Sequence, residues 1–209
     1  MANRRELEYF RIDGAVGGSQ EWFCEWSMYF GGCAAVTACD LCLHLALFRG
    51  REELYPFDLT RLDRREYIAF GRVMKPYLRP RANGVNTLAL YTDGLTAYWR
   101  GRGVRDLSVE EVPGTLSADE GWEAVRGGLD RGIPVPFLLL RHRDLRLKDY
   151  IWHWFILAGY EEAEGKRRVR VVTYGEEKWL DFDGLWDTGF REKGGAILVR
   201  ETGDAPADT

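Results

Sequence analysis

The run from Cys33 to Phe48, directly after two glycines, restricts the fold of this 209-residue chain more than any other segment. Apolar residues occur on nearly every face of a helix built from this run, which is typical of a helix buried on most sides. Asp40 and His44 interrupt the run, and it is shorter than the ~20 residues that a membrane span needs. We therefore expect a buried helix in a soluble protein without a membrane span, ending near Gly50.

Helical patterns continue through the first half of the chain, and strand patterns dominate the second half. Asp63 and the charged residues after it indicate a helix start, and apolar residues recur at helical spacing up to Met74. A third helix is expected over about 86–100, and Ser117 is a typical N-cap for a helix over 118–129. Strands are expected over 104–112, 133–140, 151–160, 169–174, 178–182 and 196–200.

Helices followed by an antiparallel sheet define an α+β fold. Because no segment is rich enough in Pro, Gly or Ser to act as a linker, we expect one domain over residues 1–202. A chain of this length buries roughly 70% of its unfolded surface and needs no disulfide or metal to fold. The small polar tail, 203–209, is predicted to be disordered.

Charge and cysteine content narrow the functional classes. The net charge of −4 argues against nucleic-acid binding, which normally needs a basic face. The first eleven residues lack the apolar core of a secretory signal, so we expect a reduced, cytoplasmic protein. Zinc binding by Cys39 and Cys42 would require Cys24 and Cys33 as further ligands, and this use is less favoured. No cofactor is expected.

Cys33 is the candidate nucleophile. It follows Gly31 and Gly32 at the expected start of the buried helix, where free backbone N–H groups and the helix dipole favour a thiolate. The two glycines also allow a substrate backbone to approach without Cβ clashes. The simpler alternative is that Cys33 is a small apolar residue of a buried helix, as free cysteines often are.

The chain contains three histidines, and two of them are poor candidates for a base acting on Cys33. His44 follows Cys33 by eleven residues on the same helix, which separates them by roughly 16 Å along the axis. We expect a structural contact between His44 and Asp40, one turn earlier. His142 lies among charged residues in a polar connection and is expected at the surface.

His153 is the candidate base. It stands between Trp152 and Trp154, at the head of an apolar strand, where a polar ring needs a hydrogen-bonding partner. A cysteine at a helix start combined with a histidine at a later strand start follows the logic of thiol hydrolases. A core histidine whose polar atoms are satisfied is the alternative interpretation.

Three segments carry a resemblance to a known family. Gly31 to Ala38 resembles the nucleophile helix of papain-like cysteine peptidases, especially the bacterial group related to the C39 bacteriocin-processing peptidases. Residues 127–135 are similar to that group's passage from helix to strand, and 153–160 to its strand with the catalytic histidine. The resemblance implies a helical part, with the nucleophile helix, packed on a C-terminal antiparallel sheet. Residues 50–110 fall outside it and are interpreted as a helical insert.

The chain departs from the family pattern at two positions. The family orients its histidine with an Asp or Asn at the end of the following strand, where this chain has Thr173. Thr173 is one candidate for this role, and Asp181 or Asp183 on the next strand is another. The family also places an oxyanion-stabilising Gln shortly before the cysteine, whereas Gln20 lies thirteen residues upstream.

The resemblance implies a cysteine hydrolase, either a peptidase or an amidase, which forms an acyl-enzyme through a Cys33–His153 thiolate pair. Acyl transfer to an amine uses the same intermediate, so an acyltransferase stays open. The rival hypothesis is a non-catalytic papain-like domain that binds a peptide or a protein partner. In that case the aromatic cluster between Trp22 and Phe30 would form the binding surface.

Overall fold

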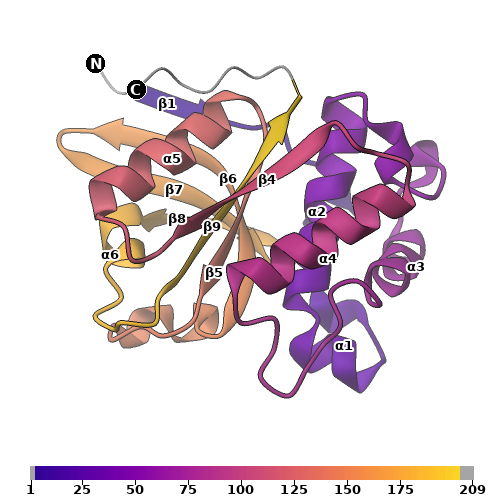
Figure 1. The fold of residues 1–209 in the computed structure, drawn as a ribbon, viewed down its shortest axis with the longest axis horizontal. Helices are drawn as coiled ribbons and strands as arrows, with labels where there is room; N and C mark the ends of the chain where they lie inside the picture. Colours follow the sequence, from indigo (N-terminus) through magenta and orange to yellow (C-terminus); the bar gives the residue numbers. More distant parts are fainter. Residues whose placement is uncertain (1–2, 203–209) are drawn as a thin grey trace.

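The computed structural model describes residues 3–202, and the tail predicted to be disordered, 203–209, lies outside them. Helices α1 to α4 lie in one half of the molecule, and the sheet lies in the other half together with α5 and α6 (Figure 1), so the α+β class is confirmed. The α-helices are α1 (Trp26–Gly31), α2 (Cys33–Phe48), α3 (Arg64–Met74), α4 (Leu88–Gly101), α5 (Ala118–Asp130) and α6 (Phe182–Trp186).

Within the described residues, seven strands form one antiparallel sheet in the order β4-β9-β5-β6-β7-β8, and β1 pairs with β6. Their bounds are β1 (Asn3–Glu6), β4 (Leu107–Pro113), β5 (Val135–Leu139), β6 (His153–Ala163), β7 (Lys166–Thr173), β8 (Glu176–Asp181) and β9 (Gly194–Glu201). A separate hairpin consists of β2 (Arg11–Ile12) and β3 (Ala15–Val16).

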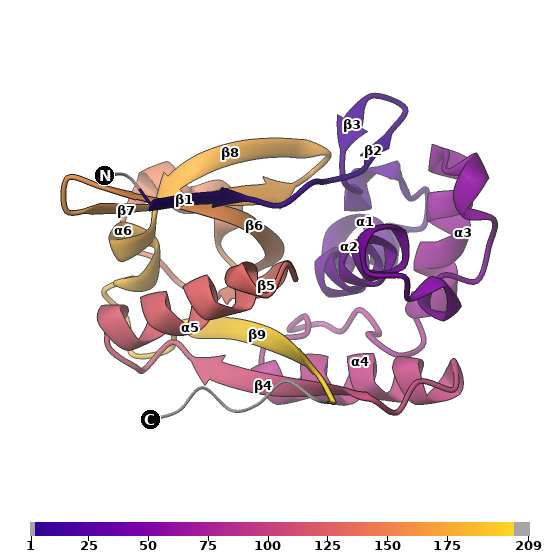
Figure 2. The same ribbon diagram turned by 90° about the horizontal axis from the view of Figure 1, so that it is seen from above.

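The sheet is strongly curved and separates two apolar cores. Figure 2 shows α5 and α6 inside the curve and α2 outside it. Alternation along β6 explains the separation, because successive side chains of a strand point to opposite faces. Trp154 and Ile156 belong to the core that contains α2, whereas Phe155 and Leu157 belong to the core that contains α5.

The buried helix predicted from the apolar run is confirmed as α2. Every residue from Ala34 to Ala46 is buried, and the helix packs against β5 and β6. Burial on all sides is possible because α2 lies between the sheet and α3. The first turn of α2 is thereby held beside the start of β6.

Helix caps and strand patterns in the sequence correctly predicted most of the other elements. Asp63 caps α3 through Glu66 N–H, and Ser117 forms a capping box with Glu120 at the start of α5. The predicted strands correspond to β4–β9, although Phe182 begins α6 instead of ending β8. The sequence patterns predicted no element before Cys33, whereas this segment contains β1, the β2–β3 hairpin and α1.

Two predictions about histidines are wrong. His44 does not pair with Asp40; its Nε2 lies 3.1 Å from the Glu8 carbonyl oxygen, because the N-terminal segment passes over α2. His142 is not at the surface but 8% exposed. Its Nε2 donates to the Gly184 carbonyl oxygen at 2.7 Å, and its Nδ1 accepts from Asp144 N–H at 2.9 Å, so His142 ties the 140s loop to α6.

Candidate functional site

Cys33 is the first residue of α2, and α1 leads directly into it. Gly32 is at once the C-cap of α1, where its N–H donates to the Met28 carbonyl oxygen, and the N-cap of α2. A Cβ atom at Gly32 would overlap that oxygen, so the tight junction requires glycine. The junction places the Cys33 side chain in the first turn of a buried helix.

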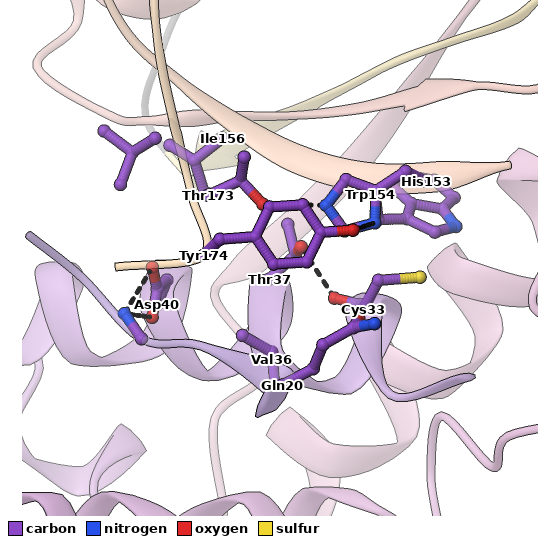
Figure 3. A pocket seen from close by; sticks show the side chains of 12 residues that line it. Gln20, Cys33, Val36, Thr37, Asp40, His153, Trp154, Ile156, Thr173 and Tyr174 are labelled. Carbon is purple, nitrogen blue, oxygen red and sulfur yellow. Dashed lines mark hydrogen bonds between the residues drawn. The ribbon is translucent and has the colours of Figure 1, made fainter. Parts of the chain in front are cut away.

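A small cavity with room for about one water molecule lies behind Cys33. The elements that meet there are α2, the starts of β6 and η1 (Gln20–Trp22), and the end of β7 (Figure 3). Its lining includes four of the residues selected from the sequence, namely Gln20, Cys33, His153 and Thr173. Tertiary structure therefore brings together residues that are up to 153 positions apart along the chain.

The Cys33 thiol is in its neutral form near neutral pH. Although the residue is only half-buried, the protein atoms around the sulfur raise the pKa of the thiol. Backbone N–H groups of Trp154, Ala34 and Cys33 itself oppose this shift without reversing it. The helix start thus stabilises the thiolate, as predicted, but desolvation outweighs it.

His153 is held by Thr173. The His153 Nε2 lies 2.7 Å from the Thr173 hydroxyl oxygen, so the residue at the end of β7 is a hydrogen-bonding partner of the imidazole. When Nε2–H donates to this hydroxyl, Nδ1 carries the lone pair that a base needs. Burial lowers the pKa of His153 to about 4, so the imidazole is neutral near pH 7.

Tyr174 covers one face of the imidazole. The two rings are parallel within 2°, with centroids 4.6 Å apart, and the Tyr174 hydroxyl lies 3.4 Å from His153 Nδ1. Tyr174 and Gly175 both have positive φ, at 55° and 76°, which is typical of a type I′ hairpin turn. The β7–β8 turn thus places an aromatic ring directly after Thr173, a feature that the sequence analysis missed.

Cys33 and His153 share the cavity without a hydrogen bond between their side chains among those found in residues 3–202. The backbone N–H of Trp154, next to His153 in β6, lowers the pKa of the thiol, although burial outweighs it. In Figure 3 the Nδ1 edge of the imidazole faces the side of Cys33, and Thr173 lies at the opposite edge. Cys33 and His153 therefore line one cavity, with the Nδ1 side of the imidazole towards Cys33.

Gln20 also reaches the nucleophile. The twelve residues between Gln20 and Cys33 contain α1, which folds back so that Gln20 lines the cavity with Cys33. One amide hydrogen of Gln20 donates to the Tyr29 carbonyl oxygen at 2.9 Å, and Gln20 Oε1 is buried without a partner in the described chain. The second amide hydrogen is free to donate.

The sequence analysis missed the role of Asp40, which lines the same cavity two turns after Cys33. Its carboxylate accepts from Gly18 N–H at 3.1 Å, from the Tyr67 hydroxyl at 2.5 Å and from the Tyr9 hydroxyl at 3.2 Å. Burial raises the pKa of Asp40 to about 6. A carboxylate within an otherwise apolar helix was the available signal.

Asp40 connects α2 to the turn that holds His153. The Gly18 N–H donates to Asp40, and the Gly18 carbonyl oxygen accepts from Gly175 N–H at 3.1 Å. Gly175 directly follows the Thr173–Tyr174 pair. The backbone around Gly18 therefore fixes α2 relative to the β7–β8 turn, which contains Thr173.

The prediction that Asp181 orients His153 is wrong. Asp181 pairs with Arg168 across the β7–β8 hairpin, five residues along the strand from Thr173, which corresponds to roughly 16 Å. Its carboxylate caps α6 by accepting from Gly184 N–H at 2.6 Å. The alternative, Asp183, forms an ion pair with Arg167.

No group of three or more His, Cys, Asp or Glu side chains in residues 3–202 is arranged to hold a metal ion. None of the helices in that range combines the length and hydropathy that crossing a bilayer would require. Comparison of the chain with protein-family models, curated proteins and solved structures yields no significant match.

Proposed function

We propose that the chain is a papain-like cysteine hydrolase, a peptidase or amidase, in which Cys33 is the nucleophile and His153 the base. One observation carries the proposal: the first residue of a buried helix, a cysteine, shares a cavity with a histidine whose far nitrogen is held by Thr173 at 2.7 Å. This combination matches the requirements of an activated nucleophile, namely a base within reach and a third group that orients the base.

The electrostatics favour proton transfer during attack over a preformed thiolate–imidazolium pair. Burial raises the pKa of Cys33 and lowers the pKa of His153 to about 4, so both groups rest neutral. A rotation of the Cys33 side chain towards His153 Nδ1 precedes the reaction. Nδ1 then takes the thiol proton while sulfur attacks the carbonyl carbon.

The remaining steps use groups already at the site. The negative charge on the carbonyl oxygen is stabilised by backbone N–H groups at the start of α2, with the free amide hydrogen of Gln20 as a second donor. His153 returns its proton to the leaving nitrogen, which leaves an acyl group on Cys33. Water, or an amine in an acyltransferase, then releases the acyl group.

The test uses p-nitrophenyl acetate, an activated ester that needs no knowledge of the natural substrate. Attack by sulfur forms an acetyl thioester and releases p-nitrophenolate, and the thiol proton passes to His153. Mass spectrometry should find the acetyl group on Cys33, appearing and then disappearing by hydrolysis. Cys24, which is exposed, serves as the internal reference.

Substitution His153→Ala should slow acetylation of Cys33 by about a hundredfold, the lower end of what general-base catalysis contributes. It should leave Cys24 unchanged. Acetylation of Cys33 no faster than that of Cys24, or equal rates with and without His153, would overturn the proposal. That outcome would favour the non-catalytic domain, which the exposure of Trp26 (77%) and Phe30 (65%) on α1 supports as second candidate.

A further inference from the structure

The outer side of Cys33 opens into a groove, separate from the small cavity behind it. The groove is lined by Phe30 from α1, by Arg81 and Asn83 from the loop before α4, and by Trp152. Trp152 has a φ of 55° and is 49% exposed, so its ring points outward while the next residue, His153, is buried. Two exposed aromatic rings thus flank the approach to the thiol.

Arg81 is the only charged side chain in this lining. It is exposed, and no ion pair or side-chain hydrogen bond within residues 3–202 occupies its guanidinium. No carboxylate lines the groove. An unpaired guanidinium beside a nucleophile is a ready partner for an anion, because its planar fork matches the two oxygens of a carboxylate.

The positive character continues along the surface. A second hollow shares Asn83 and Trp152 with the groove, and its charged lining consists of Arg141, Arg191, Lys193, Glu111 and Glu192. Arg141 pairs with Glu192 at 3.6 Å, whereas Arg191 has no ion pair among the described residues. Basic side chains therefore outnumber acidic ones on this face, although the whole chain carries a net charge of −4.

We propose that the groove selects an acidic peptide, with Arg81 binding a substrate carboxylate close to the scissile carbonyl. The aromatic faces of Phe30 and Trp152 pack against the apolar parts of the same segment. Arg191 extends the attraction to a second acidic group further along the peptide. The peptide substrate rests on the proposed function, whereas the preference for an anion beside Cys33 is independent of it.

The test compares two alkylating reagents of similar size, the anionic iodoacetate and the neutral iodoacetamide. Each forms an S–C bond to the cysteine as the C–I bond breaks, with release of iodide and of the thiol proton. The quantity measured is the iodoacetate-to-iodoacetamide rate ratio at Cys33, divided by the same ratio at the exposed Cys24. Mass-spectrometric mapping of the native full chain supplies both rates.

We expect this normalised ratio at Cys33 to be about five or more at low salt, because one nearby positive charge attracts the iodoacetate anion by about that factor. The ratio should fall as ionic strength rises. Arg81→Gln should reduce it to about one. The matched control is Arg79→Gln, which removes an exposed arginine two residues away that does not line the groove, and which should keep the ratio.

A ratio near one in the unmodified protein, or equal loss in both variants, would overturn the anion preference. Failure of Cys33 to react with either reagent would overturn it as well, because the groove would then not lead small anions to the thiol. These outcomes are distinct from failure of the hydrolase proposal, in which Cys33 reacts with iodoacetate but does not turn over p-nitrophenyl acetate.

Discussion

Thr173 determines which nitrogen of His153 is available at the site. When the Thr173 hydroxyl, 2.7 Å from Nε2, accepts the proton of that nitrogen, Nδ1 is left as the acceptor on the side of Cys33. A threonine orients an imidazole by one hydrogen bond but, unlike an aspartate, adds no charge that would raise the pKa of the histidine. The low pKa of His153, about 4, is consistent with this neutral partner.

Removal of this hydroxyl should impair the reaction without disturbing the fold. We expect Thr173→Val to slow acetylation of Cys33 by about tenfold or more, because Nε2 loses its acceptor and the imidazole loses its orientation. Thr173→Ser, which retains a hydroxyl, is the matched control and should stay within about threefold of the original rate. Equal rates for the Val and Ser variants would show that Thr173 does not orient the base.

At the scale of elements, the α1–α2 junction places Cys33. Two helices follow one another with a single residue between them, and that residue is Gly32. Its Cβ position coincides with the Met28 carbonyl oxygen, whereas a Cβ atom at the neighbouring Gly31 would lie 3.3 Å from Pro80 Cβ, a tight but adjustable contact. The two adjacent glycines therefore differ sharply in what they tolerate.

This difference predicts the effects of two alanine substitutions. Gly32→Ala should lower the free energy of unfolding by about 2–4 kcal/mol, because the backbone of α1 must move to admit the methyl group. Gly31→Ala should change it by less than about 1 kcal/mol, since alanine's better helix propensity offsets the tight contact. Urea unfolding followed by fluorescence measures both, and equal losses would contradict the junction's geometry.

At the scale of the whole molecule, three buried titratable groups make folding depend on pH. Burial lowers the pKa of His44 and of His153 to about 4, from an ordinary value near 6.5. Below pH 6.5 the unfolded chain therefore binds protons at these two residues that the folded chain does not. Asp40 acts in the opposite direction, because its pKa is raised to about 6 and the folded chain binds its proton first.

The sum predicts a loss of stability as pH falls from 6.5 to 4.5. Over this pH range each histidine should lower the free energy of unfolding by about 2–3 kcal/mol, and Asp40 should raise it by about 2 kcal/mol. The net decrease is then roughly 3 kcal/mol. Urea unfolding at both pH values tests this. His44→Gln should reduce this pH-dependent loss of stability, and Asp40→Asn should enlarge it. The same difference between the two pH values in both variants as in the original protein would contradict these roles of His44 and Asp40.

Local patterns in the sequence predicted much of the fold. The bounds of α2 follow from its mostly apolar run, and the starts of α3 and α5 from Asp63 and Ser117, because periodicity and helix caps involve residues close in the chain. The same local reasoning selected Cys33 and His153, and the structure places both at one cavity. Helix α1 was missed because its aromatic residues lack a polar stripe.

Tertiary structure alone decided which of the selected residues meet. Strand register brings Thr173 to His153 and carries Asp181 away to the start of α6, and no property of either residue by itself distinguishes them. The protonation state of Cys33 is likewise decided by tertiary structure. The helix start favours a thiolate at Cys33, as its position in the sequence indicates, but packing against β6 removes water from the sulfur and keeps the thiol neutral.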